Sequence, residues 1–582
     1  MKAGRRLGGI LILLTAVFAF QAQAQDPQPE SGSGWEDKQS VTGSRFMVAA
    51  ANPHAVRAGY DVLKRGGTAL DAAVAVQMVL NLVEPQSSGI GGGAFLLYWD
   101  AVNKQLHTID GRETAPAAAT PERFLEPDGT KMKFSKAVVG GQSVGVPGTL
   151  RLLEHAHKRF GKTPWPSLFE PAITLAEKGF RVSPRLSASI ANARRRGLDK
   201  FSATRDYFFD AAGAPRPVGY VLKNVAFAAT LRTIAAEGAD VFYSGDIARD
   251  IVVAVAATSL LTNNITLADL RNYRAKGRPP VCTGYRNYQV CGMGPPTSGG
   301  LTVGQILGML AHYDLREMGW NAEFVHLFAE TAKLAYADRG LYMADSDFVE
   351  VPVRGLLDPE YLKSRTERID RNRSMGKAKP GDPPKKQTLR LAPSNNPDRP
   401  GTSHIVIRDS YGNALSMTTT IESGFGSRVM VRGFLLNNEL TDFDRQPKRD
   451  GRLVANRVEG GKRPRSSMSP TIVFKDGAPY LLIGSPGGSR IINYVAKSIL
   501  AILDWGMDPQ DALEIGHFAH RNGKALELES GTAATAFADM LGAKGHTIAT
   551  RDMNSGLHVI LIKNGTLTGA ADPRREGIAR GE

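Results

Sequence analysis

The chain has 582 residues, a length that predicts two domains or one unusually large one and excludes a peptide, a small disulfide scaffold and a coiled coil. Hydrophobic residues make up 42% of it and charged residues 22%, which is typical of a globular protein and not of a disordered one. The formal net charge is +15, and the position of that charge decides what it implies about partners.

The first 24 residues predict an export signal. Basic residues precede an apolar run over residues 7–20, and small residues follow it up to Ala24. That order is typical of a secretory signal peptide cleaved after Ala24. A membrane anchor is the alternative, but the run is shorter than the ~20 residues that a spanning helix needs. We therefore expect a periplasmic or secreted protein with no stable membrane span.

Hydrophobic periodicity predicts strands at both ends of the chain and helices between them. In the first part we expect a buried strand over residues 46–51, helices over 54–65 and 69–82, and a strand over 95–99. Helical patterns dominate residues 148–339, with clear examples at 301–313 and 322–338. Strands return at 403–409, 414–420, 471–475, 480–483 and 558–563. This order predicts an α+β layered fold in which distant segments share one sheet system.

A glycine-rich turn at residues 89–93 precedes the strand over 95–99. It superficially resembles a phosphate-binding loop, but no Gly-Lys-Ser/Thr sequence follows and no helix begins there. Close packing of backbone against backbone is the better explanation for these glycines.

Much of the positive charge lies in one segment. Residues 362–400 contain 11 Lys and Arg against 4 Asp and Glu, so they carry +7, and they contain no aromatic residue. A nucleic-acid surface would need this charge on a folded face with aromatic side chains that stack on bases. A flexible basic connector explains the composition better, and we expect no nucleic-acid partner.

The chain has two cysteines, Cys282 and Cys291, which flank a predicted hairpin. In an oxidising compartment they can form a disulfide, and two neighbouring free thiols are the alternative. No histidines accompany them, and no spaced set of ligands occurs elsewhere, so we expect no metal and no cofactor; His54 and His404 are expected to be structural.

Directly after the connector, Gly401 and Thr402 stand at the start of a buried strand. A hydroxyl that follows a glycine there can attack the preceding carbonyl in an N-to-O acyl shift, since glycine adds no side-chain bulk. Hydrolysis of the ester would make Thr402 a new N-terminus. Its α-amine could then accept the proton of its own hydroxyl, an arrangement used in nucleophilic catalysis.

Five further segments occur in a fixed order around this junction. They are EPQSSGIGGG at 84–93, DGRETAP at 110–116, LLNNELTDF at 435–443, KRPRSSMSPT at 462–471 and GSPGGSR at 484–490. With the Gly-Thr junction they closely resemble the γ-glutamyltranspeptidase (glutathione hydrolase) family, from about residue 43 to the C-terminus.

The resemblance implies a four-layer αββα sandwich of the N-terminal nucleophile hydrolase type, made as a precursor that cuts itself between Gly401 and Thr402. It implies a large subunit of residues 25–401 and a small subunit of residues 402–582, which remain together as a heterodimer. Thr402 matches the family nucleophile, and Thr420 matches the residue that hydrogen-bonds it and assists processing. Gly487 and Gly488 match the glycines whose N–H groups form the oxyanion hole.

The resemblance also implies how a γ-glutamyl group is recognised. Arg112 matches the cation that holds the α-carboxylate, with Ser466 and Ser467 as hydroxyl donors. Glu439 and Asp442 match the residues that accept hydrogen bonds from the α-ammonium. The expected activity is hydrolysis of the γ-glutamyl amide of glutathione and related compounds, or transfer of the acyl group to amines.

Two positions depart from the family pattern. Glu422 stands where an asparagine is usual, so it either joins the two acids of the site or pairs with Arg428 or Arg432. Residues 444–465 correspond to the lid over the site, and they are short, basic and free of aromatic residues. We expect an open site in which water competes well with acceptor amines.

Two other functions fit parts of the pattern. One is a β-lactam side-chain acylase (glutaryl or cephalosporin acylase) on the same fold, against which Arg112, Glu439 and Asp442 argue. The other is a precursor that stays uncut and only binds ligands.

Overall fold

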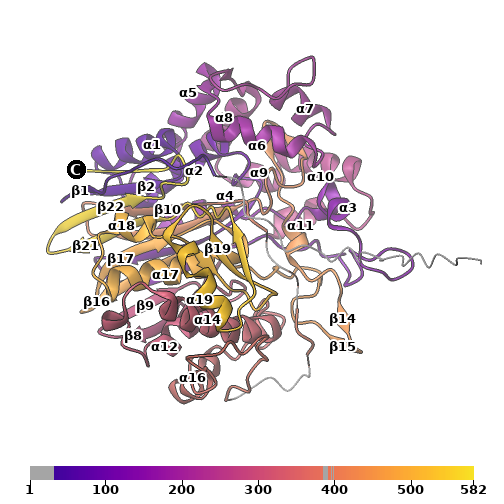
Figure 1. Ribbon diagram of the computed structural model, residues 1–582. Coiled ribbons are helices and arrows are strands. Elements are labelled where there is room, and N and C mark those ends of the chain that lie inside the picture. The colour runs from indigo at the N-terminus through magenta and orange to yellow at the C-terminus, as the bar shows by residue number, and fades with distance from the viewer. Residues whose placement is uncertain (1–31, 385–390, 395, 397–398) are drawn as a thin grey trace, which may run out of the picture.

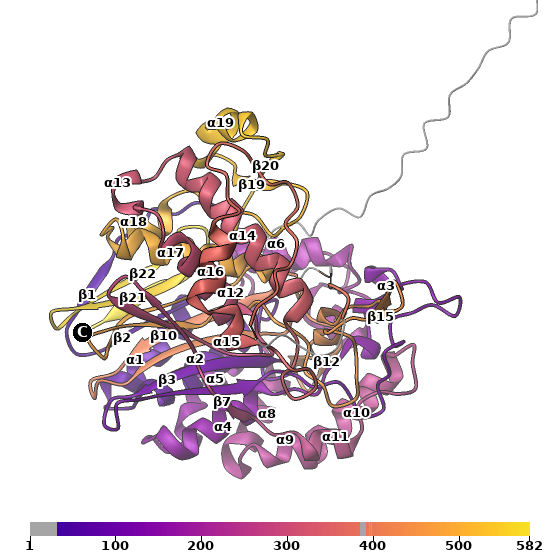
Figure 2. The same ribbon diagram turned by 90° about the horizontal axis from the view of Figure 1, so that it is seen from below.

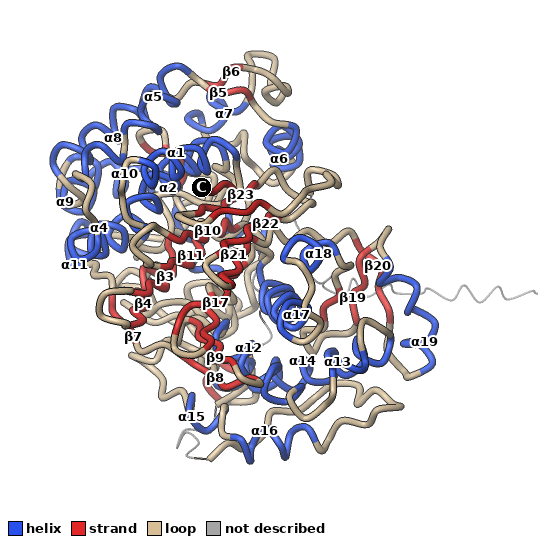
Figure 3. Tube along the Cα trace, turned by 90° about the vertical axis from the view of Figure 1, so that its left-hand side faces the viewer, coloured by secondary structure: helices blue, strands red, loops and turns tan. Residues whose placement is uncertain are grey.

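The computed structural model describes residues 32–384, 391–394, 396 and 399–582, so the predicted signal peptide at 1–24 lies outside the described residues. Two seven-stranded sheets lie face to face in the middle of the molecule, and helices cover the outer face of each (Figure 1). The same layers are visible from below and along the sheets (Figures 2 and 3). The expected α+β layered sandwich is therefore present.

Both sheets combine segments from distant parts of the chain, and every neighbouring pair of strands in them is antiparallel. The first sheet has the order β23 (Ile578–Gly581), β2 (Met47–Ala50), β10 (Thr402–Arg408), β11 (Ala414–Thr420), β3 (Gly93–Asp100), β4 (Gln105–Gly111) and β7 (Lys276–Arg278). The second has the order β1 (Val41–Gly43), β22 (Thr566–Ala571), β21 (His558–Lys563), β17 (Ala478–Gly484), β16 (Thr471–Lys475), β9 (Tyr288–Gly292) and β8 (Val281–Tyr285).

Strand β2 shows why such a strand must be apolar throughout. Its side chains alternate between the two faces of the sheet. Met47 and Ala49 belong to the core that includes the second sheet, whereas Val48 and Ala50 belong to the core under α1 and α2. Because both faces are buried, the strand is a continuous apolar run in the sequence.

The outer helices begin at recognisable caps. Helices α1 (Pro53–Lys64), α2 (Ala69–Val83) and α4 (Thr149–Phe160) contact the first sheet. Asn52 caps α1 with Pro53 as the first helical residue, and Thr68 and Asp71 form a capping box on α2. Helices α12 (Gly299–Leu310), α17 (Ile491–Leu503) and α18 (Pro509–Glu514) contact the second sheet, and α14 (Ala322–Tyr342) packs on α12.

The remaining elements extend the two helical layers and their edges. The helices are α3 (Phe134–Val138), α5 (Glu170–Lys178), α6 (Pro184–Arg194), α7 (Ser202–Phe208), α8 (Val225–Glu237), α9 (Asp240–Ser244), α10 (Asp246–Thr258), α11 (Leu267–Asn272), α13 (Leu315–Met318), α15 (Val353–Leu356), α16 (Pro359–Thr366) and α19 (Ala538–Ala543). Small sheets pair β5 (Phe180–Arg181) with β6 (Val221–Leu222), β12 (Met430–Val431) with β13 (Phe434–Leu435) and β14 (Lys448–Arg449) with β15 (Arg452–Leu453). A three-stranded sheet joins β18 (Phe518–Ala519), β19 (Leu526–Glu529) and β20 (Ile548–Arg551).

Most predicted elements are confirmed within a few residues, and β11, β16 and β21 begin and end where the sequence predicts. The predicted hairpin around the cysteines is β8 and β9, and Cys282 and Cys291 face each other there and form a disulfide. Among the described residues, no helix combines the length and the apolar character needed to cross a bilayer.

The segment 362–400, predicted to be a flexible connector, begins inside a helix. Leu362 lies within α16, which Asp358 caps and Pro359 begins. Farther on, the N–H groups of Met375 and Gly381 donate to buried acids of α14, Glu330 (2.8 Å) and Asp338 (2.8 Å). The composition of the segment did not predict this packing, because backbone N–H groups make these contacts and the segment contains few apolar side chains.

Candidate active site

A small pocket lies beside the first residue of β10 and brings together segments that are hundreds of residues apart. Its lining residues are Arg112, Arg399, Thr402, Thr420, Glu422, Glu439, Asp442, Ser466, Ser467, Met468, Gly488 and Ile491. The predicted site residues therefore meet at one place. Gly401 and Gly487 are not among the lining residues, but each directly precedes one of them in the sequence, Thr402 and Gly488. Arg399, Met468 and Ile491 were not predicted.

The register of two strands positions Thr402. It pairs directly with Thr420 across β10 and β11, and both residues are buried. The preceding Gly401 packs so closely on the next turn that a Cβ there would lie 2.0 Å from the carbonyl oxygen of Glu422. Glycine is therefore required at 401 by space, as well as being suited to the attack of a neighbouring hydroxyl.

The Thr420 hydroxyl is aimed at the bond between Gly401 and Thr402. Its Oγ1 donates to the Gly401 carbonyl oxygen over 2.8 Å and accepts from the Glu422 N–H over 2.7 Å. A donor at this oxygen polarises the carbonyl and stabilises negative charge that develops there when a nucleophile attacks its carbon. Thr420 thus contacts the carbonyl of the Gly401–Thr402 peptide bond.

Gly487 and Gly488 stand where the second sheet meets the N-terminus of α17. They follow β17, and Gly488 begins the short turn that leads into this 13-residue helix. The N-terminus of a helix carries partial positive charge from its backbone N–H groups. The position suits stabilisation of an oxyanion at the pocket that Gly488 lines.

The glycine-rich turn at 89–93 packs against the backbone of Thr420 and Leu435, next to this site. A Cβ on Gly92 would lie 2.0 Å from the Thr420 carbonyl oxygen, and one on Gly91 would lie 2.1 Å from that of Leu435. Close packing of backbone against backbone explains these glycines, as the sequence predicts.

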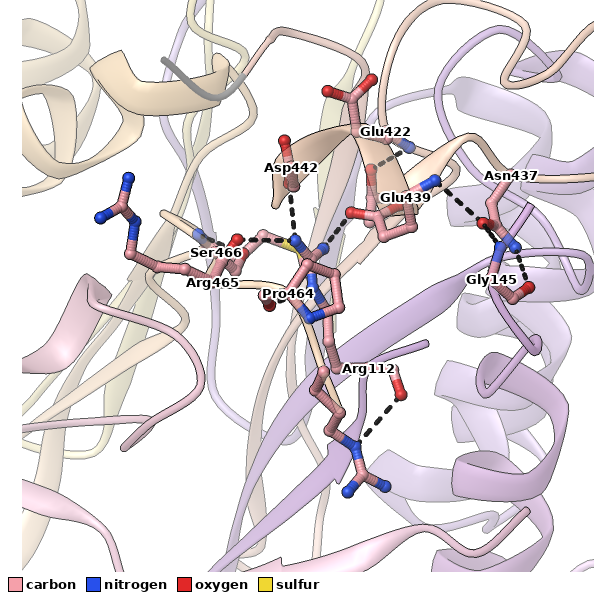
Figure 4. A network of polar contacts seen from close by, with 12 residues as sticks. Arg112, Gly145, Glu422, Asn437, Glu439, Asp442, Pro464, Arg465 and Ser466 are labelled. Carbon is pink, nitrogen blue, oxygen red and sulfur yellow. Dashed lines mark hydrogen bonds and ion pairs between the residues drawn. The ribbon is translucent and has the colours of Figure 1, made fainter. Parts of the chain in front are cut away.

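The charged half of the pocket is a buried cluster around Arg112 (Figure 4). Arg112 follows β4, and the short turn Glu439–Asp442 holds both acids. The guanidinium is ion-paired with Glu439 through Nη1 and with Asp442 Oδ2 through Nη2, the latter over 2.6 Å. It also donates to the carbonyl oxygens of Pro464 (3.2 Å) and Arg465 (3.0 Å). Arg112 thus binds the two acids directly, a contact that the sequence did not predict.

Burial governs the ionisation of this cluster. It raises the pKa of Glu439 well above its usual range, and the charge of Arg112 opposes that shift. Burial also raises the pKa of Glu113, which lies next to Glu439. For Arg112, burial acts to lower the pKa, but Glu439 and Asp442 outweigh it and the pKa is raised. The guanidinium stays charged, and Glu439 and Glu113 hold their protons more tightly than exposed carboxyls do.

Ser466 and Ser467 form hydrogen bonds with Ser298, which precedes α12, and with Arg339 of α14. The N–H and the hydroxyl of Ser298 both donate to the Ser466 carbonyl oxygen, over 2.9 and 2.7 Å. Arg339 donates to the Ser467 hydroxyl over 2.7 Å. Residues of the other predicted subunit therefore hold the Ser467 hydroxyl and the Ser466 backbone at the pocket.

Glu422 lines the pocket, and in the described part of the chain it forms neither a hydrogen bond nor an ion pair with Arg428 or Arg432, its two alternative partners. Its Oε2 accepts from Asn438 Nδ2 over 2.7 Å. Arg428 donates to Ser423 and Gly426, and Arg432 pairs with Asp250. Burial raises the pKa of Glu422, against the charges of Arg399 and Arg112. Of the two alternatives, the structure thus favours a third acid in the site.

The segment that corresponds to the lid does not line the pocket. Within residues 444–465 most of the exposed residues lie in the hairpin of β14 and β15, and residues 454–456 are buried. Asn456 supports the site from outside by donating to the Asp442 carbonyl oxygen over 2.8 Å. No aromatic side chain is among the described residues that line the pocket.

A second cluster of potential ligands lies away from this pocket. His326, Glu330 and His546 are buried with their ligand atoms within 4.8 Å of one another. The place of a cation at Glu330 is already taken, because Lys333 Nζ lies 2.6 Å from its Oε1. The pair of His326 and His546 is joined by a hydrogen bond of 2.8 Å. The cluster thus has structural contacts of its own.

Arg399 and Arg339 were not predicted from the sequence, and each contacts a segment that is far from it in the chain. Arg399 lies with its guanidinium over the Phe134 ring, 3.6 Å from the centroid. Its place just before Gly401 is a signal that could have identified it. For Arg339, the signal in the sequence is a charged residue within the apolar pattern of the buried helix α14.

Comparisons with known proteins agree with this geometry. The sequence matches the γ-glutamyltranspeptidase family over residues 55–581. It is 39% identical to a glutathione hydrolase proenzyme of Bacillus subtilis (98% of this chain, 97% of the relative) and 35% identical to an acylase ACY 1 proenzyme of a Pseudomonas species (95% and 96%). The crystal structure of a cephalosporin acylase from Bacillus halodurans superposes with a TM-score of 0.83 at 26% identity, covering 97% of this chain and 99% of that one. The family match over most of the sequence decides the assignment: the chain belongs to the γ-glutamyltranspeptidase family.

Proposed function

We propose that this protein is an autoprocessed γ-glutamyl hydrolase and transferase that acts on glutathione and related γ-glutamyl amides, with Thr402 as its nucleophile. The observation that carries the proposal is the placement of Thr402 and Thr420 opposite each other, beside a pocket with both an arginine and acids. The proenzyme names of the relatives support the maturation step.

Maturation begins with the Thr402 hydroxyl attacking the Gly401 carbonyl carbon. Thr420 stabilises the charge on the Gly401 oxygen, to which it already donates. The C–N bond breaks, an ester to Thr402 Oγ1 forms, and the freed amine takes a proton. Water then hydrolyses the ester, which leaves Gly401 as a carboxylate and Thr402 with a free α-amine. The products are a large subunit of residues 25–401 and a small one of 402–582, which stay together as a heterodimer.

In catalysis the same hydroxyl attacks the γ-carbonyl carbon of the substrate. Its own α-amine accepts the proton, and the N–H groups of Gly487 and Gly488 stabilise the oxyanion. The leaving amine departs with that proton. Water or an acceptor amine then attacks the γ-glutamyl ester and regenerates Thr402.

The charged residues define the other end of the substrate. Arg112, Ser466 and Ser467 provide a cation and two hydroxyls for an α-carboxylate, and Glu439 and Asp442 accept from an α-ammonium. In the intact chain these opposite charges satisfy each other. A zwitterionic α-amino acid group can replace both sides of that pairing at once, whereas a glutaryl group offers no ammonium to the acids.

Export is part of the proposal. A signal peptide over residues 1–24 would deliver the precursor to the periplasm or the medium, an oxidising setting that suits the disulfide between Cys282 and Cys291.

A denaturing gel of the purified protein tests the nucleophile. We expect two bands for the wild type and one for Thr402→Ala, which also loses activity by on the order of 10⁴-fold. A single wild-type band that persists with time would contradict the proposal and favour an uncut binding protein.

Paired substrates test the specificity. γ-Glutamyl-p-nitroanilide should be cleaved in preference to glutaryl-p-nitroanilide, and the reverse order would favour a β-lactam side-chain acylase. With excess Gly-Gly we expect glutamate to exceed the γ-glutamyl peptide, because none of the described residues that line the pocket is aromatic. Dominant transfer would refute the open-site interpretation.

A further inference from the structure

Arg339 connects α14 to the serines of the pocket. Its residue is 5% exposed, near the end of the helix. Its Nη2 donates to Ser467 Oγ over 2.7 Å, and its Nε donates to Ser298 Oγ over 2.7 Å. Ser298 in turn donates to the Ser466 carbonyl oxygen over 2.7 Å. One guanidinium thus contacts one serine directly and the other through a single hydroxyl.

This contact fixes the direction in which Ser467 can donate. An arginine has no acceptor, so Ser467 Oγ accepts from it and the serine proton must point away from Arg339. Ser466 Oγ likewise accepts from the Met468 N–H over 3.1 Å. Both oxygens receive an N–H from the protein and both residues line the pocket. The arrangement turns them into donors, and a hydroxyl that accepts from a cation donates more strongly itself.

The acids of the pocket already pair with Arg112, so binding a substrate carboxylate would benefit from a second positive charge nearby. Arg112 faces both Glu439 and Asp442, so its charge is offset before any substrate enters. A substrate carboxylate that arrives beside this cluster needs further positive potential. Arg339 supplies it from one hydroxyl away, at a buried position where a charge acts more strongly than it does in water.

We propose that Arg339 is a positioning residue for the α-carboxylate of the γ-glutamyl group. It orients the Ser467 hydroxyl toward that carboxylate and contributes positive potential through it. The inference rests on the proposed function. It also couples the two predicted subunits, because Arg339 belongs to residues 25–401 and Ser467 to residues 402–582.

Steady-state kinetics with γ-L-glutamyl-p-nitroanilide test the proposal in the processed enzyme. We expect Arg339→Met to raise KM on the order of tenfold to a hundredfold while kcat changes less than about threefold, since a hydrogen bond to a charged group is lost in the bound state. Arg339→Lys keeps the charge and should have a smaller effect in the same direction. Arg365→Lys is the matched control. This buried arginine of α16 binds Asp338, the residue before Arg339 in α14, and it does not line the pocket.

Two further measurements separate positioning from a structural role. With 4-aminobutyryl-p-nitroanilide, which lacks the α-carboxylate, Arg339→Met should change kcat/KM less than about threefold. In a double-mutant cycle, Arg339→Lys should add little to Ser467→Ala, because both act on one hydroxyl. Equal losses on both substrates, or additive effects in the cycle, would overturn the proposal.

The outcomes also distinguish this inference from the proposed function. A wild-type enzyme that fails to cleave the γ-glutamyl substrate would refute the function itself. A wild type that cleaves it, together with Arg339 variants whose KM is unchanged, would refute only the role of Arg339. If Arg339→Met does not yield two subunits, the Arg339→Lys cycle with Ser467→Ala decides.

Discussion

The proposed cleavage junction and the proposed recognition pocket touch each other but are built in different ways. The junction depends on one hairpin, in which the register of β10 and β11 sets Thr402 opposite Thr420. The pocket depends on Arg112, which meets Glu439 across 327 positions of the chain. The junction can therefore be disturbed by local changes, whereas the pocket depends on the assembly of the whole sandwich. The following substitutions test whether maturation and recognition separate along this line.

The largest effect should come from Thr420→Ala. It removes the donor to the Gly401 carbonyl oxygen, and we expect cleavage of the precursor to slow on the order of 10²–10³-fold. The conversion of one band into two on a denaturing gel, followed over time, measures this rate. Thr420→Ser keeps the hydroxyl and is the control. A fully processed Thr420→Ala protein at the earliest time would show that this hydroxyl does not assist the cut.

Asp442→Asn should affect recognition and leave maturation intact. The amide keeps the size of the side chain but removes the charge that faces Arg112 over 2.6 Å. We expect kcat/KM for γ-glutamyl-p-nitroanilide to fall on the order of a hundredfold, mostly through KM, while two bands still form. Loss of processing in this variant would mean that the junction and the pocket are not separable.

Glu422 lies where the two regions meet, and its effect should be smaller and dependent on pH. Burial raises its pKa, so the side chain becomes charged only as the pH rises through that raised value. We expect the wild-type preference for γ-glutamyl over glutaryl substrates to increase with pH. In Glu422→Gln the preference should be several-fold lower at alkaline pH and independent of this titration. Parallel pH profiles of the two proteins would show that Glu422 does not sense the substrate amine.

What the sequence could predict follows the same division. The junction was predictable, because the strands at 403–409 and 414–420 are short and separated by one turn, so their antiparallel pairing places Thr402 and Thr420 together. The contact of Arg112 with both acids was not predictable, since it needs the positions of β4 and of the turn at Glu439–Asp442 in three dimensions. Arg339 lies in a helix that is buried on nearly all sides, where periodicity does not indicate which side chain faces the site.

The smallest expected effect concerns stability. Glu113 is buried beside Glu439, and burial raises its pKa well above the usual range, an effect to which the neighbouring Glu439 carboxyl adds. A carboxyl whose pKa is raised by folding contributes its full stability below the unfolded pKa of about 4.3, and that stability is lost as the pH rises toward the folded value. Glu113→Gln stays neutral and removes this loss.

Thermal unfolding of the two proteins between pH 4 and pH 8 measures the difference. We expect similar stability at pH 4 and a more stable variant at pH 8, by about 1–3 kcal/mol, the cost of leaving a buried polar group without the hydrogen bond that its proton makes. Glu113→Ala is the comparison, because it also removes the charge but leaves a void and should be less stable at both pH values. If Glu113→Gln loses stability as the pH rises just as the wild type does, the proton is held elsewhere in the cluster around Arg112.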